Sequence, residues 1–254
     1  MKVISLQSGS NGNCIYVEAG GRRLLLDAGI SGLQAERRLA ARGIDIRRCD
    51  GVFISHDHRD HIRCAGVYQR KFKLPIYCTV ATLETASRCL DLGELCDVRG
   101  FVSGSTMDLG GLRVETIRTP HDAADGVGFV LDDGRHRLGV LTDLGHVFAA
   151  LPGVVASLDA VLIESNYDPH LLETGPYPYP LKQRISGPHG HLSNAEASEL
   201  VRAAGRKLRW VCLGHLSEDN NNPQLALTTA REILGNKLPI QVATRYEATE
   251  VMAV

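Results

Sequence analysis

One short segment constrains this chain more than any other part of its sequence. The apolar run Gly51-Val52-Phe53-Ile54 is typical of a buried strand, and one residue later comes His56-Asp57-His58-Arg59-Asp60-His61. Because side chains alternate along an extended segment, His56 and His58 face the same side and can bind one ion, while Asp60 and His61 can face a second. A polar surface loop with coincidental histidines is the alternative. Four ligand-type side chains within six positions favour a metal site instead.

The composition is that of a globular chain with a substantial core. Of 254 residues, 44% are hydrophobic and 22% are charged, and no low-complexity linker or repeat divides them. We therefore expect a single domain over residues 1–254. No stretch resembles a signal peptide or a membrane span, which predicts a cytoplasmic protein without a membrane partner. The seven cysteines form no Cys-x-x-Cys pair and are interpreted as reduced, mostly buried side chains.

The net charge gives no bulk signature of nucleic-acid binding. Lysine and arginine number 28 and aspartate and glutamate 29, so the formal charge is 28 − 29 = −1. A nucleic-acid substrate would therefore have to be held by local groups.

Hydrophobic periodicity and turn residues predict an alternation of strands and helices. Strands are expected over 3–6, 15–18, 23–26, 51–54, 75–78, 95–102, 112–119, 129–131, 137–142, 158–163 and 208–213. Helices are expected from the N-cap Ser31 to about 42, over 62–72, over 81–90, from Ser193 to about 204, and over 223–234. The first three strands form a β-meander. This order suits two packed sheets with helices outside.

The histidine segment resembles the His-x-His-x-Asp-His signature of the metallo-β-lactamase superfamily. The other residues of that pattern are present in strand-end contexts: Asp27, His121, Asp143 and His215. The resemblance implies an α/β fold, a four-layer αββα sandwich with two mixed sheets. It also implies one metal ion held by His56, His58 and His121 and a second by Asp60, His61 and His215. Asp143 would bridge the two ions, and Asp27 would support the ligands from behind.

Two neighbouring ions supply a specific chemistry. They lower the pKa of a shared water toward neutrality and stabilise a developing oxyanion, so Asp60 and Asp143 act in catalysis and no serine or cysteine nucleophile is needed. The cofactors expected are two divalent ions, Zn²⁺ or Mn²⁺, with iron also compatible with these ligands.

Over nearly its full length the chain resembles the YycJ/WalJ group of exonucleases. The shared segments are Ser8 to Asn13, Glu164-Ser165-Asn166, Gly190 to Asn194 and His215 to Asn221. The resemblance implies a phosphodiesterase, specifically a 5′ to 3′ exonuclease on DNA ends with a role in DNA repair. Two alternatives remain: a hydrolase of a small cyclic phosphodiester, thioester or lactam, and a non-catalytic metal-stabilised regulatory or DNA-binding module. The sequence does not indicate an oligomeric state.

His191 precedes the helix that begins near Ser193, where free N–H groups attract anions. By resemblance to related ribonucleases we assign it to phosphate binding or to general acid catalysis. The alternative is a histidine that only packs or caps the loop. Ser165, Asn166, Arg184 and Asn194 are the candidate substrate-binding residues.

Residues 166–188 are expected to form a long loop with a helix fragment. The segment contains Tyr167, Tyr177 and Tyr179 together with Lys182, Arg184 and several prolines and glycines. Such residues can stack bases and attract phosphates. Equally, the segment can be a proline-stiffened connection whose tyrosines pack against the core.

Overall fold

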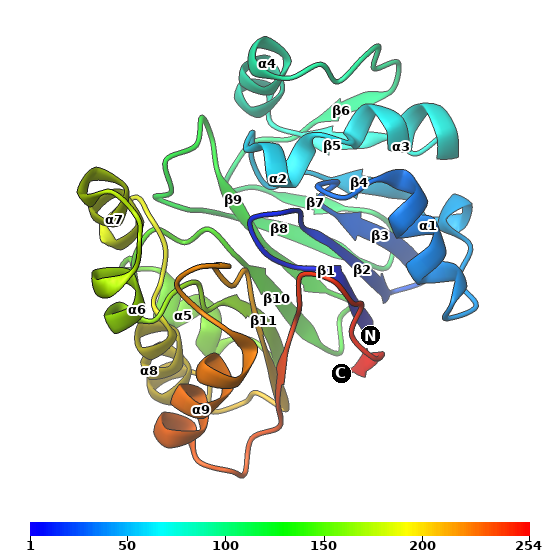
Figure 1. The fold of residues 1–254 in the computed structure, drawn as a ribbon. Helices are drawn as coiled ribbons and strands as arrows, with labels where there is room; N and C mark the ends of the chain where they lie inside the picture. The colour runs from blue at the N-terminus through cyan, green and yellow to red at the C-terminus, as the bar shows by residue number, and fades with distance from the viewer.

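Two seven-stranded sheets dominate the fold, a computed structural model that describes residues 1–254. In the first sheet the strand order is β14-β1-β2-β3-β4-β5-β6, and in the second it is β13-β12-β11-β10-β9-β8-β7 (Figure 1). The strands of the first sheet are β1 (Lys2–Gln7), β2 (Cys14–Ala19), β3 (Arg22–Leu26), β4 (Gly51–Phe53), β5 (Ile76–Cys78), β6 (Val98–Gly100) and β14 (Met252–Ala253). Those of the second are β7 (Thr106–Asp108), β8 (Arg113–Arg118), β9 (Val127–Asp132), β10 (Arg137–Leu141), β11 (Ala160–Glu164), β12 (Trp210–Gly214) and β13 (Ile240–Val242).

The chain has nine helices, most of which pack on the outer faces of the two sheets. They are α1 (Gly32–Ala40), α2 (Arg59–Ile62), α3 (Ala65–Phe72), α4 (Val80–Cys89), α5 (Leu151–Ala156), α6 (Pro169–Thr174), α7 (Tyr179–Ser186), α8 (Asn194–Ala204) and α9 (Pro223–Leu234), with a 3₁₀ turn at Ile46–Arg48. No helix is long and apolar enough to cross a membrane.

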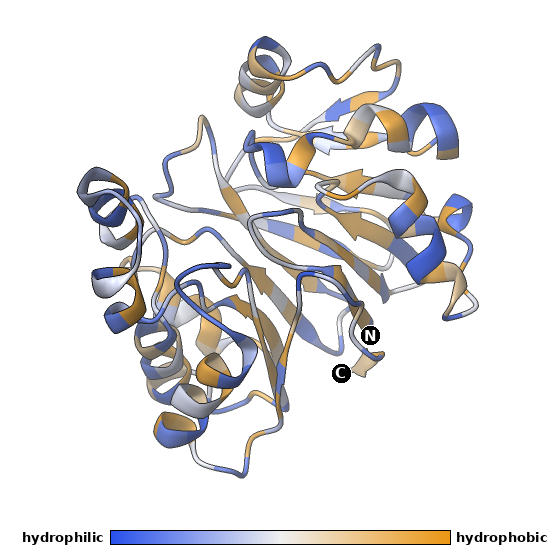
Figure 2. Ribbon diagram, in the orientation of Figure 1, coloured by the Kyte–Doolittle hydropathy of each residue, from blue (hydrophilic) through white to orange (hydrophobic).

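Three hydrophobic cores fill the spaces between four layers. One core of 22 buried residues joins the first sheet to α1, α3 and α4, and one of 18 joins the second sheet to α5, α8 and α9. Between them, 21 buried residues join the two sheets. Figure 2 shows the matching pattern, with hydrophobic positions along the strands and hydrophilic ones on the helices. The predicted αββα sandwich of two mixed sheets is confirmed.

The topology places the carboxyl ends of several parallel strands at one edge of the sandwich. Strands β1, β2 and β3 form the predicted antiparallel meander, whereas β3 to β6 run parallel. In the second sheet β10 to β13 run parallel. Loops that leave the carboxyl ends of parallel strands are where open α/β sheets bind their ligands.

Some predicted elements differ from the structure. The helix expected over 62–72 begins only at Ala65, as α3, and Ile62 ends the separate short helix α2. The two are interrupted where the backbone N–H of Cys64 donates to Ala28 O and not to the preceding turn. The strand expected over 95–102 is only Val98–Gly100. The long loop expected over 166–188 contains two short helices, α6 and α7. Helix α5 and strands β7, β13 and β14 were not predicted.

Candidate metal centre

Several candidate ligands and their supporting residues lie just after strands that end at the same edge of the sandwich. Asp27 follows β3, Asp143 follows β10 and His215 follows β12. All three have a left-handed backbone, with φ of 65°, 57° and 54°. Residues other than glycine seldom adopt this conformation, and it concentrates at functional sites. The chain thus turns sharply at three strand ends that meet at the same edge.

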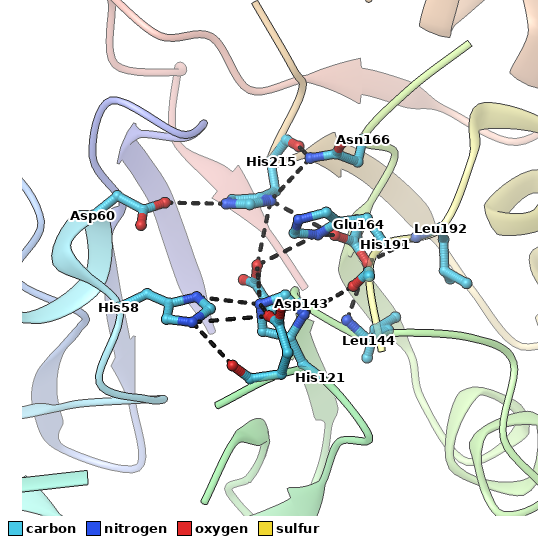
Figure 3. Close-up of polar contacts among 12 residues, drawn as sticks. His58, Asp60, His121, Asp143, Leu144, Glu164, Asn166, His191, Leu192 and His215 are labelled. Atoms are coloured by element: carbon cyan, nitrogen blue, oxygen red, sulfur yellow. Dashed lines mark hydrogen bonds and ion pairs between the residues drawn. The ribbon is translucent and has the colours of Figure 1, made fainter. Parts of the chain in front are cut away.

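The three histidines His56, His58 and His121 lie with their ligand nitrogens within 4.8 Å of one another. His121 Nδ1 donates to Gly190 O (2.8 Å), and His58 Nε2 donates to Asp122 O (3.2 Å). Each ring therefore carries its proton on the nitrogen that faces a carbonyl. The other two nitrogens, His58 Nδ1 and His121 Nε2, are 3.3 Å apart with lone pairs facing each other (Figure 3). A cation that accepts both lone pairs removes this repulsion.

A second group is formed by Asp60, His61 and His215, also within 4.8 Å. Asp60 Oδ2 lies 3.4 Å from both His61 Nε2 and His215 Nε2. Asp143 lies between the two groups, since its carboxylate oxygens are 3.4 Å from His61 Nε2, 3.5 Å from His215 Nδ1 and 3.7 Å from His121 Nε2. The structure therefore brings together all seven residues expected to bind metal.

Two buried atoms in this cluster have no hydrogen-bond partner: His56 Nε2 and Asp143 Oδ2. Leaving a buried polar atom unpaired costs about 1–3 kcal/mol, and metal ligation removes that cost. Together with the facing lone pairs, this shows that the residues present fit divalent cations. Imidazole and carboxylate are ligands that zinc, manganese and iron all accept.

Charge in the cluster is distributed unevenly. Burial, together with nearby His61, lowers the pKa of His56 well below its ordinary value, so its ring is neutral and available as a ligand. Burial opposes charge on His215 as well, but Asp143, Asp60 and Glu164 raise its pKa to about 10. In spite of burial, neighbouring histidines hold the pKa of Asp143 well below its ordinary value. Without cations, protons on the histidines therefore balance the carboxylates.

Three residues beside the cluster hold its ligands in position. Asp27 accepts hydrogen bonds from Ser55 N (2.8 Å), Ser55 Oγ (3.0 Å) and His61 Nδ1 (2.7 Å). Asn13 Nδ2 lies 3.2 Å from Asp60 Oδ2 and 3.0 Å from His61 Nε2. Asp27 thus lies behind His61, as expected. The positioning contacts of Ser55 and Asn13 were not predicted, because they join segments distant in sequence.

Glu164 is the principal residue that sequence reasoning missed. It is fully buried at the end of β11, where Oε1 accepts from His191 Nδ1 (2.5 Å) and Oε2 accepts from Leu144 N (3.0 Å) and Leu192 N (3.1 Å). Burial opposes its charge, yet His191 and His215 lower the pKa of Glu164 to about 2. This carboxylate fixes the His191 ring (Figure 3). The sequence signal that could have identified Glu164 is a carboxylate at the end of an otherwise apolar strand, the context in which Asp27 also stands.

Two of the candidate substrate-binding residues do not line the cleft over the cluster. Ser165 and Asn194 are fully buried and bonded to each other through Ser165 Oγ and Asn194 Oδ1, and Asn194 is also bonded to Asn221. In this structure their side chains hold the loops together. Asn166 and Arg184 do line the cleft over the cluster.

That cleft has a volume of about 360 Å³. Helix α7 forms one wall with Leu181, Arg184 and Ile185, and Arg184 is paired with Asp122. The remaining lining residues are Ser10, His58, Arg59, Asp60, His121, Asp143, Asn166, Tyr177, His191, His215 and Ser217. Arg59 is exposed and has no ion-pair partner, so the cleft has a free cation at its rim.

Comparisons with a protein family, with individual proteins and with solved structures all relate this chain to proteins of the β-lactamase superfamily. Residues 22–215 match a family described as the β-lactamase superfamily domain. Exodeoxyribonuclease YycJ of Bacillus anthracis is 32% identical over 235 residues, which cover 91% of this chain and 88% of that protein. Exodeoxyribonuclease WalJ of Streptococcus pneumoniae serotype 2 is 36% identical over 229 residues, 88% of this chain and 84% of that one. The metallo-β-lactamase fold protein YhfI from Bacillus subtilis superposes with a TM-score of 0.70 at 16% identity and covers 98% of this chain and 99% of its own.

Proposed function

Because this chain belongs to the β-lactamase superfamily and is a hydrolase with the metallo-β-lactamase fold, we propose that it is a metal-dependent exonuclease acting on DNA ends in the 5′ to 3′ direction. The observation that carries the proposal is His191, which is bonded to Glu164 and lines the same cleft as five of the seven potential metal ligands. Relatives named exodeoxyribonuclease that align with about nine-tenths of the chain support DNA as the substrate. A role in DNA repair follows by analogy with them.

In this proposal the chain binds two divalent ions, Zn²⁺ or Mn²⁺. His56, His58 and His121 would hold one ion, and Asp60, His61 and His215 would hold the other. Asp143, which lies between the two groups, would be available to either ion. Such ions, when bound, activate a water and stabilise charge on the phosphoryl oxygens.

The protein's own side chains perform the remaining steps. Glu164 accepts the Nδ1 proton of His191, which leaves Nε2 as the position from which a proton passes to the leaving oxygen. A water gives one proton to a carboxylate of the cluster, Asp60 or Asp143, as its oxygen forms a bond to phosphorus. The bond from phosphorus to the leaving oxygen breaks, and that oxygen takes the proton of His191. Arg59, at the rim of the cleft, attracts the phosphate next to the one being cleaved. Leu181 and Ile185 exclude water from the opposite wall.

The test is digestion of end-labelled single- and double-stranded DNA and RNA by protein reconstituted with Mn²⁺ or Zn²⁺. We expect stepwise loss from the 5′ end of DNA, and at least a thousandfold loss of rate in the Asp60→Ala/His61→Ala variant. Replacing His191 by alanine should lower kcat by about 10²–10⁴ with metal content unchanged, because general acid catalysis contributes about that much. The matched control is His136→Ala, a histidine on the β9–β10 turn outside the cluster.

Other outcomes would contradict the proposal in distinguishable ways. Cleavage of a cyclic phosphodiester, thioester or lactam without DNA cleavage would identify a small-molecule hydrolase. Metal-loaded protein that hydrolyses none of these would leave a metal-stabilised binding module. Unchanged turnover in His191→Ala would remove the general-acid role but not the metal site.

A further inference from the structure

A second groove lies on the other side of helix α7. It has a volume of about 490 Å³ and is lined by Tyr167, Pro169, Leu172, Glu173, Tyr179, Lys182, Gln183 and Ser186. Residues of α7 three or four positions apart share a face, and the face with Tyr179, Lys182 and Gln183 lines this groove, while the face with Leu181, Arg184 and Ile185 lines the catalytic cleft. We propose that this groove, named here the α6–α7 groove, binds a nucleobase of the substrate strand beyond the scissile phosphate.

Helix α7 has no buried residue, which is unusual for a helix with two adjacent hydrophobic side chains on its surface. It lies at the outer edge of the molecule, away from both sheets (Figure 1). The helix is held by a few polar contacts, among them Lys182 Nζ to Glu173 O (2.6 Å) and the Arg184–Asp122 pair. Packing in the core therefore does not account for the residues of α7. The two cavities on either side of the helix do account for them.

Tyr179 is the most exposed large hydrophobic residue of the fold, at 72%. The sequence left open whether the tyrosines of this segment pack against the protein or stack bases. Tyr167 is buried and Tyr179 is exposed, and both line the groove. An exposed aromatic ring above the apolar floor of Pro169 and Leu172 is a surface on which any base can stack.

The charges of the groove favour a base over a phosphate. Lys182 is the only cation among the lining residues, and Glu173, which forms no ion pair, offsets it. Gln183 is exposed and its amide has no hydrogen-bond partner within the protein, so it is free to bond to a base edge. A groove without net charge gives binding that depends little on salt, in contrast with a phosphate track.

The position of the groove fixes the length of strand it needs. Asn166 lines the cleft and its neighbour Tyr167 lines the groove, so the two cavities adjoin. A helix with its side chains is about 10–12 Å across, and stacked nucleotides rise about 3.4 Å each, so the width of α7 corresponds to about three nucleotides. The groove therefore takes a base about three or four nucleotides from the scissile phosphate.

This inference rests on the proposed nuclease function, and substrate length tests it. We would measure kcat/KM for oligodeoxynucleotides of 2, 4, 6 and 8 residues with the metal-loaded protein. For the parent protein, kcat/KM should rise with substrate length up to about four or five nucleotides and then level off. Tyr179→Ala should lose about tenfold on the 6- and 8-residue substrates and nothing on the dinucleotide, equally at low and high salt. Tyr179→Phe should retain the gain because the ring remains.

The matched control is Tyr246→Ala. Tyr246 is 67% exposed, but it lines neither the cleft over the cluster nor the α6–α7 groove. Identical length profiles for Tyr179→Ala and the parent would overturn the inference while leaving the nuclease proposal intact. If the parent hydrolyses no phosphodiester, fluorescence anisotropy of a labelled octanucleotide still decides: weaker binding by Tyr179→Ala than by Tyr246→Ala supports the groove, and equal binding rejects it.

Discussion

At the scale of single residues, the site depends on side chains held in a costly backbone conformation. Asp27, Asp143 and His215 are three of only four non-glycine residues with positive φ. The left-handed region costs an ordinary residue about 1–2 kcal/mol, and metal ligation and the contacts of the two sheets offset that cost.

A pair of substitutions at Asp143 measures this cost. Both Asp143→Gly and Asp143→Ala remove the shared ligand, but glycine adopts φ of 57° without a steric penalty. We expect the glycine variant to be about 1 kcal/mol more stable than the alanine variant in urea unfolding with EDTA present. At Gly153, a position of α5 where an added methyl group meets nothing within 4 Å, the order should reverse, with Gly153→Ala the more stable form. Equal stability of the two Asp143 variants would show that the left-handed backbone carries no strain.

At the scale of elements, two helices begin with the same reciprocal cap, and only one of them adjoins the site. Ser31 with Gln34 starts α1, and Ser193 with Glu196 starts α8, as the sequence predicted. The second cap follows His191 by two residues, so it helps to fix the loop that carries the proposed acid.

Replacing each cap by alanine separates stability from catalysis. Ser31→Ala and Ser193→Ala should each cost about 1 kcal/mol of folding free energy in chemical denaturation, because each leaves an N–H of the first turn unpaired. Only Ser193→Ala should also lower kcat, by about threefold to tenfold, with KM and metal content nearly unchanged. An equal effect of both variants on kcat would mean that the α8 cap has no part in positioning His191.

At the scale of the whole molecule, the metal centre joins the two sheets. Asp60 and His61 follow a strand of the first sheet, whereas His121, Asp143 and His215 follow strands of the second. Ions bound here connect both halves of the sandwich, so binding stabilises the fold by linkage, by about 2.7 kcal/mol at a free metal concentration one hundred times Kd.

In the metal-free protein, the stability of the fold should therefore depend on pH. In the metal-free protein the pKa of His215 is raised from 6.5 to about 10, so its stabilising contribution is complete below pH 6.5 and is lost as pH rises toward 10. A bound ion replaces the proton of His215. The metal-loaded protein should therefore not lose the stability that this proton contributes as pH rises. Thermal unfolding between pH 6.5 and 9 should show the metal-free and loaded midpoints diverging as pH rises. Parallel midpoints would mean that metal binding displaces no proton from His215.

The sequence by itself predicted the four ligand-type residues of the histidine segment and most of the regular elements, whereas His121, Asp143 and His215 were expected from the family resemblance. The spacing of His56, His58, Asp60 and His61 after an apolar strand is local information, as are the serine caps and the alternation in the meander, and all of these are found in the structure. Local signals suffice there because neighbouring residues decide strand alternation and helix capping.

Only the tertiary structure decided which other polar side chains serve the site. Glu164 and Ser55 contact residues of the cluster, whereas Ser165 and Asn194 bond to each other, although all four are polar residues near strand or helix ends. Their partners lie on other elements, from His191 for Glu164 to Asp27 for Ser55. Likewise α7 became recognisable as a helix between two cavities only in the fold, because it lacks the buried face by which a sequence pattern reveals a helix. Hydrogen bonds between distant segments and the exclusion of water arise when the layers pack, and no window of sequence contains them.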